Sequence, residues 1–241
     1  ESKNWSSFKG DTKENLVNKV LQINSKDAFE IKPLDIRFLG GKYVRELEYK
    51  FAKKFNSKYC ISSNSATSSL VMALGSLNLG VGDEVIIPSM SFNATATSVL
   101  YFNSIPVFCE VKNDTFCIDP IDFEKKITKR TKAVIVVHLG GNAADIKKII
   151  KIAKKYNIFI IEDTAQAPGV IHSKKYLGTF GDVGVFSLTE TKNITSGEGG
   201  LLITNNKNIA IKSRLIRNHG EGIAKNEWDY SELLNVIGMN F

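Results

Sequence analysis

The sequence predicts an α/β protein, a three-layer αβα sandwich around a mainly parallel sheet. From about residue 43, strand-sized apolar runs alternate with amphipathic helical stretches, which is typical of parallel sheets. The apolar runs are continuous rather than alternating, which indicates a sheet covered on both faces. The chain has 241 residues, enough for one sizeable domain or two small ones.

The expected elements follow in a regular order. Residues 1–30 are polar with one short amphipathic stretch and predict an N-terminal arm, whereas residues 31–241 predict one large domain. The predicted strands are 59–61, 84–88, 105–111, 132–139, 158–163, 182–188 and 201–204. The predicted helices are 44–55, one that carries Leu70 and Leu74, 94–100, one before 132, 143–156 and about 209–217. The candidate site of such a fold lies at the carboxyl ends of the strands.

The composition argues against several classes of protein. The formal net charge of +7 invites a nucleic-acid-binding hypothesis, but the basic residues are spread over helix faces, so we expect no nucleic acid partner. A positive field also attracts anionic substrates. No apolar stretch is long enough to cross a bilayer, and no membrane partner is expected. Cys60, Cys109 and Cys117 are far apart and predict small core residues in a reducing, cytoplasmic compartment.

Two polar residues stand where chemistry is expected. Asp163 ends an apolar strand, so its carboxylate needs a partner: a helix cap, a structural hydrogen bond, or a protonated pyridine nitrogen. Lys192 lies between an apolar strand and the Gly-rich turn 196–200, on a tight crossover rather than a solvated helix. A lysine is required by pyridoxal phosphate (PLP), which rests as an imine to a side-chain amine.

Two further features fit a phosphate-bearing ring, although each also has an ordinary explanation. Ser65 to Ser68 open a helix after the first core strand, where free amides form an anion cradle or where Ser simply caps the helix. Phe92 follows another strand end, where it either stacks on a cofactor ring or packs in the core.

These features occur together with a specific series of motifs. SNSATSSLVMAL, GDEVIIPSMSFNATA, AVIVVHLGGNAADI, IEDTAQAPG, GTFGDVGVFSLTETKNITSGEGGLLIT and RNHG follow one another in this order. From about Gly40 to Phe241 the chain resembles the DegT/DnrJ/EryC1/StrS aminotransferases. The resemblance implies fold type I of the PLP enzymes, a homodimer with active sites at the interface, glutamate as amino donor and a nucleotide-linked keto sugar as acceptor.

The resemblance also implies roles for individual residues. Lys192 is similar to the lysine that forms the Schiff base and later moves the proton, and Asp163 to the partner of the pyridine nitrogen. Gln166 resembles the residue beside the ring hydroxyl.

The remaining implied contacts surround the phosphate and the ring. Ala66 and Thr67 resemble the helix-end phosphate contacts, and Ser187 resembles a further phosphate ligand. Phe92 is similar to the stacking aromatic residue, and Asn240 to the asparagine that reaches the phosphate of the neighbouring subunit.

The chain departs from the family pattern in two places. Glu190 and Thr191 precede the lysine where members often carry other residues, and the chain ends at Phe241 where members continue into a smaller C-terminal domain. The second departure leaves open a truncated, non-catalytic or regulatory protein on the same scaffold. A sugar dehydratase is a further alternative, but those members carry His in place of Lys192. The three histidines, His138, His172 and His219, are interpreted as structural polar groups rather than as residues that contact the substrate.

Overall fold

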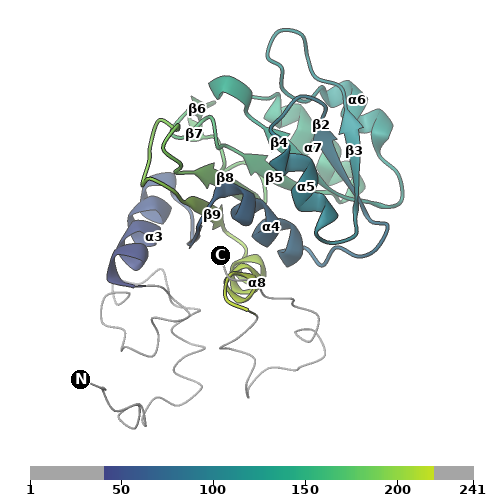
Figure 1. The fold of residues 1–241 in the computed structure, drawn as a ribbon. Helices are drawn as coiled ribbons and strands as arrows, with labels where there is room; N and C mark the ends of the chain where they lie inside the picture. The colour runs from purple at the N-terminus through teal and green to yellow at the C-terminus, as the bar shows by residue number, and fades with distance from the viewer. Residues whose placement is uncertain (1–40, 220–241) are drawn as a thin grey trace, which may run out of the picture.

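The structure is a computed structural model and describes residues 41–219. In this part of the chain a seven-stranded sheet lies between two layers of helices (Figure 1). The predicted arm over 1–30 and Asn240 fall outside these residues. The three-layer αβα architecture predicted from the sequence is confirmed.

The sheet has the strand order β1-β9-β8-β5-β4-β2-β3. Its strands are β1 (Tyr59–Ser63), β2 (Glu84–Pro88), β3 (Ile105–Cys109), β4 (Thr131–Val137), β5 (Phe159–Asp163), β8 (Val183–Ser187) and β9 (Gly200–Thr204). β9 is antiparallel to both of its neighbours, β1 and β8, while the other pairs are parallel. Six of these strands therefore run in one direction, and their carboxyl ends lie along one edge of the sheet.

Between residues 41 and 219, six α-helices cover the two faces of the sheet. They are α3 (Lys42–Phe55), α4 (Ala66–Ser76), α5 (Ala94–Leu100), α6 (Pro120–Lys126), α7 (Ile146–Tyr156) and α8 (Lys207–Arg217). Helices α4, α5 and α8 pack on the face that carries Ile61, Ile135 and Val185. Helices α6 and α7 pack on the opposite face around Ile160, and α3 extends that layer over Phe186. Both faces of the sheet are thus covered by helices, which explains why the strands are apolar at successive positions.

The prediction that the three cysteines are small core residues is also confirmed. Cys60, Cys109 and Cys117 are all buried and unpaired. Burial raises the pKa of the Cys60 thiol well above its usual range, so this thiol stays protonated and packs as a small apolar residue. Among the described helices, none combines the length and apolar character that a membrane span requires.

The hairpin of β6 (Ile171–His172) and β7 (Lys175–Tyr176) was not predicted. Its two turn residues, Ser173 and Lys174, have φ angles of 47° and 66°. A tight hairpin turn with two positive φ angles usually carries Asn-Gly or Asp-Gly, so the Ser-Lys pair gave no signal for it.

Candidate functional site

The carboxyl edge of the sheet gathers the residues that the sequence singled out. Each of them follows the end of a parallel strand, and these ends are neighbours because the strands share one direction. Ala66 and Thr67 follow β1, and Phe92 follows β2. Asp163 is the last residue of β5 and Gln166 follows it, while Ser187 is the last residue of β8 and Lys192 follows it. All the predicted site residues that the structure describes therefore lie along one edge.

Asp163 and Ser187 lie on the same face of the sheet. Side chains alternate along a strand, so Asp163 shares the face of Ile161 and Ser187 shares the face of Val185. This is the face that α4 covers. Asp163 and Val185 are register partners on adjacent strands, and Ser187 is the register partner of Gly200, whose backbone approaches the start of α4. The predicted residues of β5 and β8 thus share one face of the sheet, and Ser187 lies near the start of α4.

The Asp163 carboxyl group is nearly buried, with only 8% of the residue exposed. Its Oδ1 accepts a hydrogen bond from the Ala165 amide at 3.0 Å. Burial raises the pKa of this carboxyl group, although the Ala165 amide and the positive charge of Lys192 act in the opposite direction. No cation within the described residues forms an ion pair with Asp163. The site therefore holds a desolvated carboxylate that a cationic partner would stabilise.

The first turn of α4 faces this edge. Ser65 is the N-cap, and its hydroxyl accepts from the Ser68 amide at 3.1 Å, while the earlier amides of the helix have no acceptor inside it. Gly200 lets the β9 backbone approach this turn closely, because a Cβ atom there would lie 2.2 Å from the Ser65 carbonyl oxygen. A side chain at Gly200 would displace the start of α4.

The loop that carries Lys192 is held at its base by backbone hydrogen bonds. Leu188 donates to the Gly199 carbonyl at 2.8 Å and accepts from the Ser196 amide at 2.9 Å, which closes the loop between β8 and β9. The Lys192 amide donates to the Thr189 carbonyl at 3.0 Å. The lysine side chain is half-buried, and its charge acts on Asp163.

Gln166 and Phe92 differ in how firmly they are held. The Oε1 atom of Gln166 accepts from the Gly140 amide at 2.8 Å, in a turn where Gly140 has a φ angle of 59°. This bond orients the carboxamide at the edge of the sheet. Phe92 is 71% exposed, so the core-packing explanation for it is wrong and its ring is available to a ligand or partner.

A second buried carboxylate, Glu162, was missed by the sequence analysis. It lies on the opposite face from Asp163 and accepts from the amides of Gly178, Phe180 and Gly181 at 2.9, 2.6 and 2.6 Å. A fourth bond at 3.0 Å joins its Oε2 to Nε2 of His138. The signal was present: strand alternation puts neighbours on opposite faces, so the pair Glu162-Asp163 requires two separate partners.

His138 is fully buried and belongs to this network. Its Nδ1 accepts from the Ala144 amide at 3.2 Å, so Nε2 carries the proton that is donated to Glu162. The backbone amide of His138 also donates to the Asp163 carbonyl at 3.0 Å. His138 is thus a structural group that joins β4 to β5 beneath the site. His172 lies on β6, and His219 is exposed.

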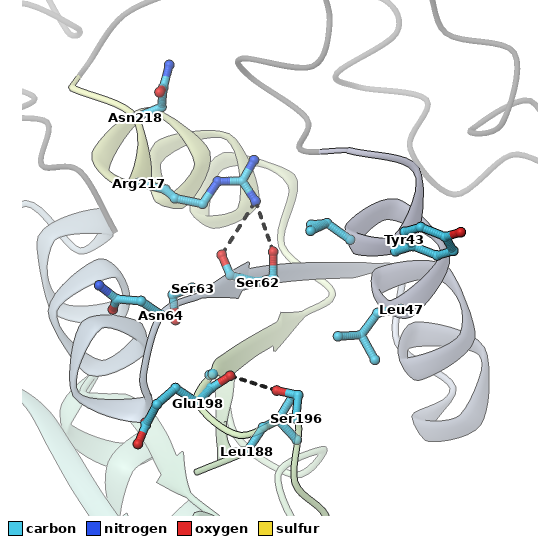
Figure 2. A pocket seen from close by; sticks show the side chains of 13 residues that line it. Tyr43, Leu47, Ser62, Ser63, Asn64, Leu188, Ser196, Glu198, Arg217 and Asn218 are labelled. Carbon is cyan, nitrogen blue, oxygen red and sulfur yellow. Dashed lines mark hydrogen bonds between the residues drawn. The ribbon is translucent and has the colours of Figure 1, made fainter. Parts of the chain in front are cut away.

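A pocket of about 530 Å³ opens beside the Lys192 loop (Figure 2). It lies between α3, the end of β1, the loop 196–200 and the end of α8. Figure 2 shows Arg217 reaching to Ser62, and Glu198 and Asn64 on the side of the loop and α4. The Glu198 carboxylate accepts from the Thr189 hydroxyl at 2.9 Å. The lining offers both donors and acceptors to a polar ligand.

A buried ion-pair cluster fixes this side of the molecule. Glu48 of α3 accepts from Arg217 at 2.9 Å, from Arg214 at 3.2 Å and from the Ser62 amide at 2.8 Å. Burial by itself would raise the pKa of Glu48, but the two guanidinium groups and Ser62 outweigh burial and lower it. The cluster joins α3, β1 and α8 next to the pocket.

The fold defines the class of protein: a PLP-dependent transferase of fold type I. Residues 30–241 match the model of the DegT/DnrJ/EryC1/StrS aminotransferase family, and the chain belongs to that family. It is 36% identical over 201 residues to GDP-perosamine synthase of Escherichia coli O157:H7. The matched region covers 83% of this chain and 54% of that protein.

Solved structures give the same result. NtdA from Bacillus subtilis, solved with the bound cofactor PMP, has a TM-score of 0.74 and 31% identity over 94% of this chain and 49% of its own. A GDP-4-keto-6-deoxymannose-3-dehydratase with a trapped PLP-glutamate geminal diamine has a TM-score of 0.75 and 28% identity, covering 83% of this chain and 56% of its own. The chain thus spans about half the length of the relatives it matches.

Proposed function

We propose that the chain is the cofactor-binding part of a PLP-dependent sugar aminotransferase. In this proposal an amino group passes from glutamate to a keto group of a nucleotide-linked sugar. The observation that carries it is Asp163, a nearly buried carboxylate without an ion-pair partner among the described residues, at the strand edge where the charge of Lys192 reaches it.

The site fits the ring of the cofactor. When bound, PLP supplies an electron sink that stabilises negative charge on the substrate carbon. Asp163 would keep a proton on the ring nitrogen, because its desolvated carboxylate is stabilised by a cation at that place. Gln166, oriented by the Gly140 amide, would hydrogen-bond beside the ring, and the exposed Phe92 would stack on it.

The site also fits a phosphate group. The amides of Ala66 and Thr67 begin α4, where the helix dipole and the first-turn N–H groups favour an anion. Ser187 adds a hydroxyl group on the same face of the sheet. The close approach at Gly200 keeps this helix start against β9 and therefore near the lysine loop.

Lys192 would hold the cofactor through its side-chain amine and move a proton at Nζ during the reaction. The backbone hydrogen bonds at Leu188 hold the base of the loop that carries this amine. Asn240 would contribute from a second copy of the chain, which makes the proposed enzyme a homodimer. The unpaired thiols agree with the proposed cytoplasmic location.

The names of the relatives support the substrate class. GDP-perosamine synthase and the GDP-4-keto-6-deoxymannose dehydratase are both named for GDP-linked sugars, and the latter was trapped with glutamate. Another relative, 39% identical over 188 residues, is named for glutamine as donor. Lys192 favours transamination over dehydration, since the sugar dehydratases of the family carry His at this position.

The proposal is tested by titrating the full chain with PLP and recording the visible absorbance. We expect a band from the lysine-bound cofactor that Lys192→Ala abolishes and that Lys147→Ala, an exposed lysine of α7, leaves unchanged. Glutamate should bleach the band, and glutamine serves as the comparison donor.

Two results would contradict the proposal. A band that persists in Lys192→Ala would assign the cofactor to another lysine. A native chain that forms no band would instead favour the non-catalytic scaffold.

A further inference from the structure

A second concave surface lies on the face of the sheet opposite α4. The α6/α7 groove, as we name it, has a volume of about 750 Å³ and is formed by Pro120, Ile121 and Lys125 of α6 and Lys148, Lys151 and Ile152 of α7. The two helices pack against each other on this face (Figure 1). The groove is therefore separated from the candidate active site by the sheet.

The floor of the groove is apolar. Ile121 is 67% exposed although it stands in the first turn of α6. Ile152 is partly buried and packs against the core beneath α7. Both isoleucines line the groove. The occupant should therefore carry apolar side chains.

The rim of the groove is basic. Lys148 and Lys155 already pair with carboxylates, Asp145 at 2.7 Å and Glu124 at 2.8 Å. Lys125 and Lys151, one on each helix, form no ion pair with any residue between 41 and 219. The groove therefore retains two unmatched positive charges on opposite sides of an apolar floor.

The spacing of the lysines suggests the shape of the occupant. Lys148, Lys151 and Lys155 recur every three or four residues on α7, so they are about 4.5 and 6 Å apart along the helix axis, on one side of the helix. Carboxylates at positions i and i+4 of a second helix have the same spacing. Such a helix could place an apolar row on the floor and carboxylates on the rim.

We infer that the α6/α7 groove binds an acidic amphipathic helix of a partner protein. Charge complementarity favours an acidic occupant, and a nucleotide is disfavoured because the residues that line the groove include no aromatic side chain on which a base could stack. A bilayer is disfavoured because the apolar residues lie in a recess between two helices. The inference is independent of the proposed function.

The probe is a fluorescein-labelled Leu/Glu peptide of about 16 residues, long enough to hold a helix. Its binding to the full chain is measured by fluorescence anisotropy. We expect the double variant Lys125→Glu/Lys151→Glu to weaken binding at least about tenfold. The matched control, Lys147→Glu/Lys154→Glu, makes the same charge change on exposed residues outside the groove and should alter affinity less than about twofold.

A third variant separates the apolar contribution. Ile121→Asn leaves the charge unchanged and should also weaken binding if the floor is used. Equal losses in the groove and control variants would overturn the inference in favour of unspecific attraction, as would a native chain that does not bind the peptide. A last outcome concerns membranes. If the native chain sediments with phosphatidylserine vesicles but does not bind the peptide, and only the groove variants lose this sedimentation, the groove binds a membrane surface and the inference is overturned.

Discussion

Replacing Glu162 with Gln removes a negative charge that four donors share beneath the candidate site. Oε1 accepts from the Phe180 and Gly181 amides, and Oε2 accepts from the Gly178 amide and from His138. Wherever the new NH₂ group lies, it faces two N–H donors. His138 cannot compensate by changing its tautomer, because its Nδ1 already accepts from an amide.

The magnitude follows from this geometry. Two hydrogen bonds to a charged acceptor are lost, each worth about 1.5 to 3 kcal/mol, so the free energy of unfolding should fall by about 3 to 6 kcal/mol. Domains of this size are stable by about 5 to 15 kcal/mol. The substitution should therefore remove a large fraction of the stability although no apolar contact changes.

The measurement is urea unfolding of the full chain followed by far-ultraviolet circular dichroism. Glu46→Gln is the control, since Glu46 pairs with Lys50 at 2.7 Å on the surface of α3 and its loss should leave the midpoint unchanged. If Glu162→Gln unfolds at the midpoint of the native chain, the network does not stabilise the fold and the reasoning fails.

Three further predictions use the same assay unless stated. Gly200→Ala should lower the midpoint and weaken PLP binding, because the added Cβ would lie 2.2 Å from the Ser65 carbonyl oxygen. Asp163→Asn should stabilise the cofactor-free chain by about 0.5 to 2 kcal/mol and weaken PLP binding, because burial raises the carboxyl pKa and ionisation costs stability at neutral pH; a lower midpoint would contradict this. Because the pKa of Glu48 is lowered from its ordinary value of 4.5, its ionised form stabilises the fold at pH values above 4.5, and this contribution is lost as the pH falls. Glu48→Gln should therefore destabilise the chain at pH 7 and make its stability depend less on pH in the acid range.

The strands and most helices could be predicted because their signal is local. Ala94–Leu100 is the helix that the sequence predicts, and Glu84–Pro88 is the predicted strand. The edge that collects the site residues also follows from the sequence, since parallel strands share one direction. Asp163 could be singled out because a carboxylate at the end of an apolar strand is costly without a partner.

The rest depends on contacts between distant parts of the chain. The partners of Glu162 lie 16 to 24 positions away, and its role appears only when the turn at Gly178 and the end of β4 meet it. The antiparallel direction of β9 likewise gave no local signal, although it brings Gly200 against the start of α4. The roles of the site residues themselves stay predictions until the cofactor titration is done.

The pairing of β1 with β9 has a consequence for how the protein is made. The Ser57 hydroxyl donates a hydrogen bond to the Thr204 carbonyl, 147 positions later, and Glu48 accepts one from Arg217, 169 positions later. On the ribosome, α3 and β1 emerge long before the strand and helix that cover them, so their apolar side stays exposed until those later segments have been made. Closing so long a loop is slow, and an unpaired β1 edge invites pairing with other nascent chains. Yield in a cell should therefore depend on chaperone supply more than on the stability of the finished fold.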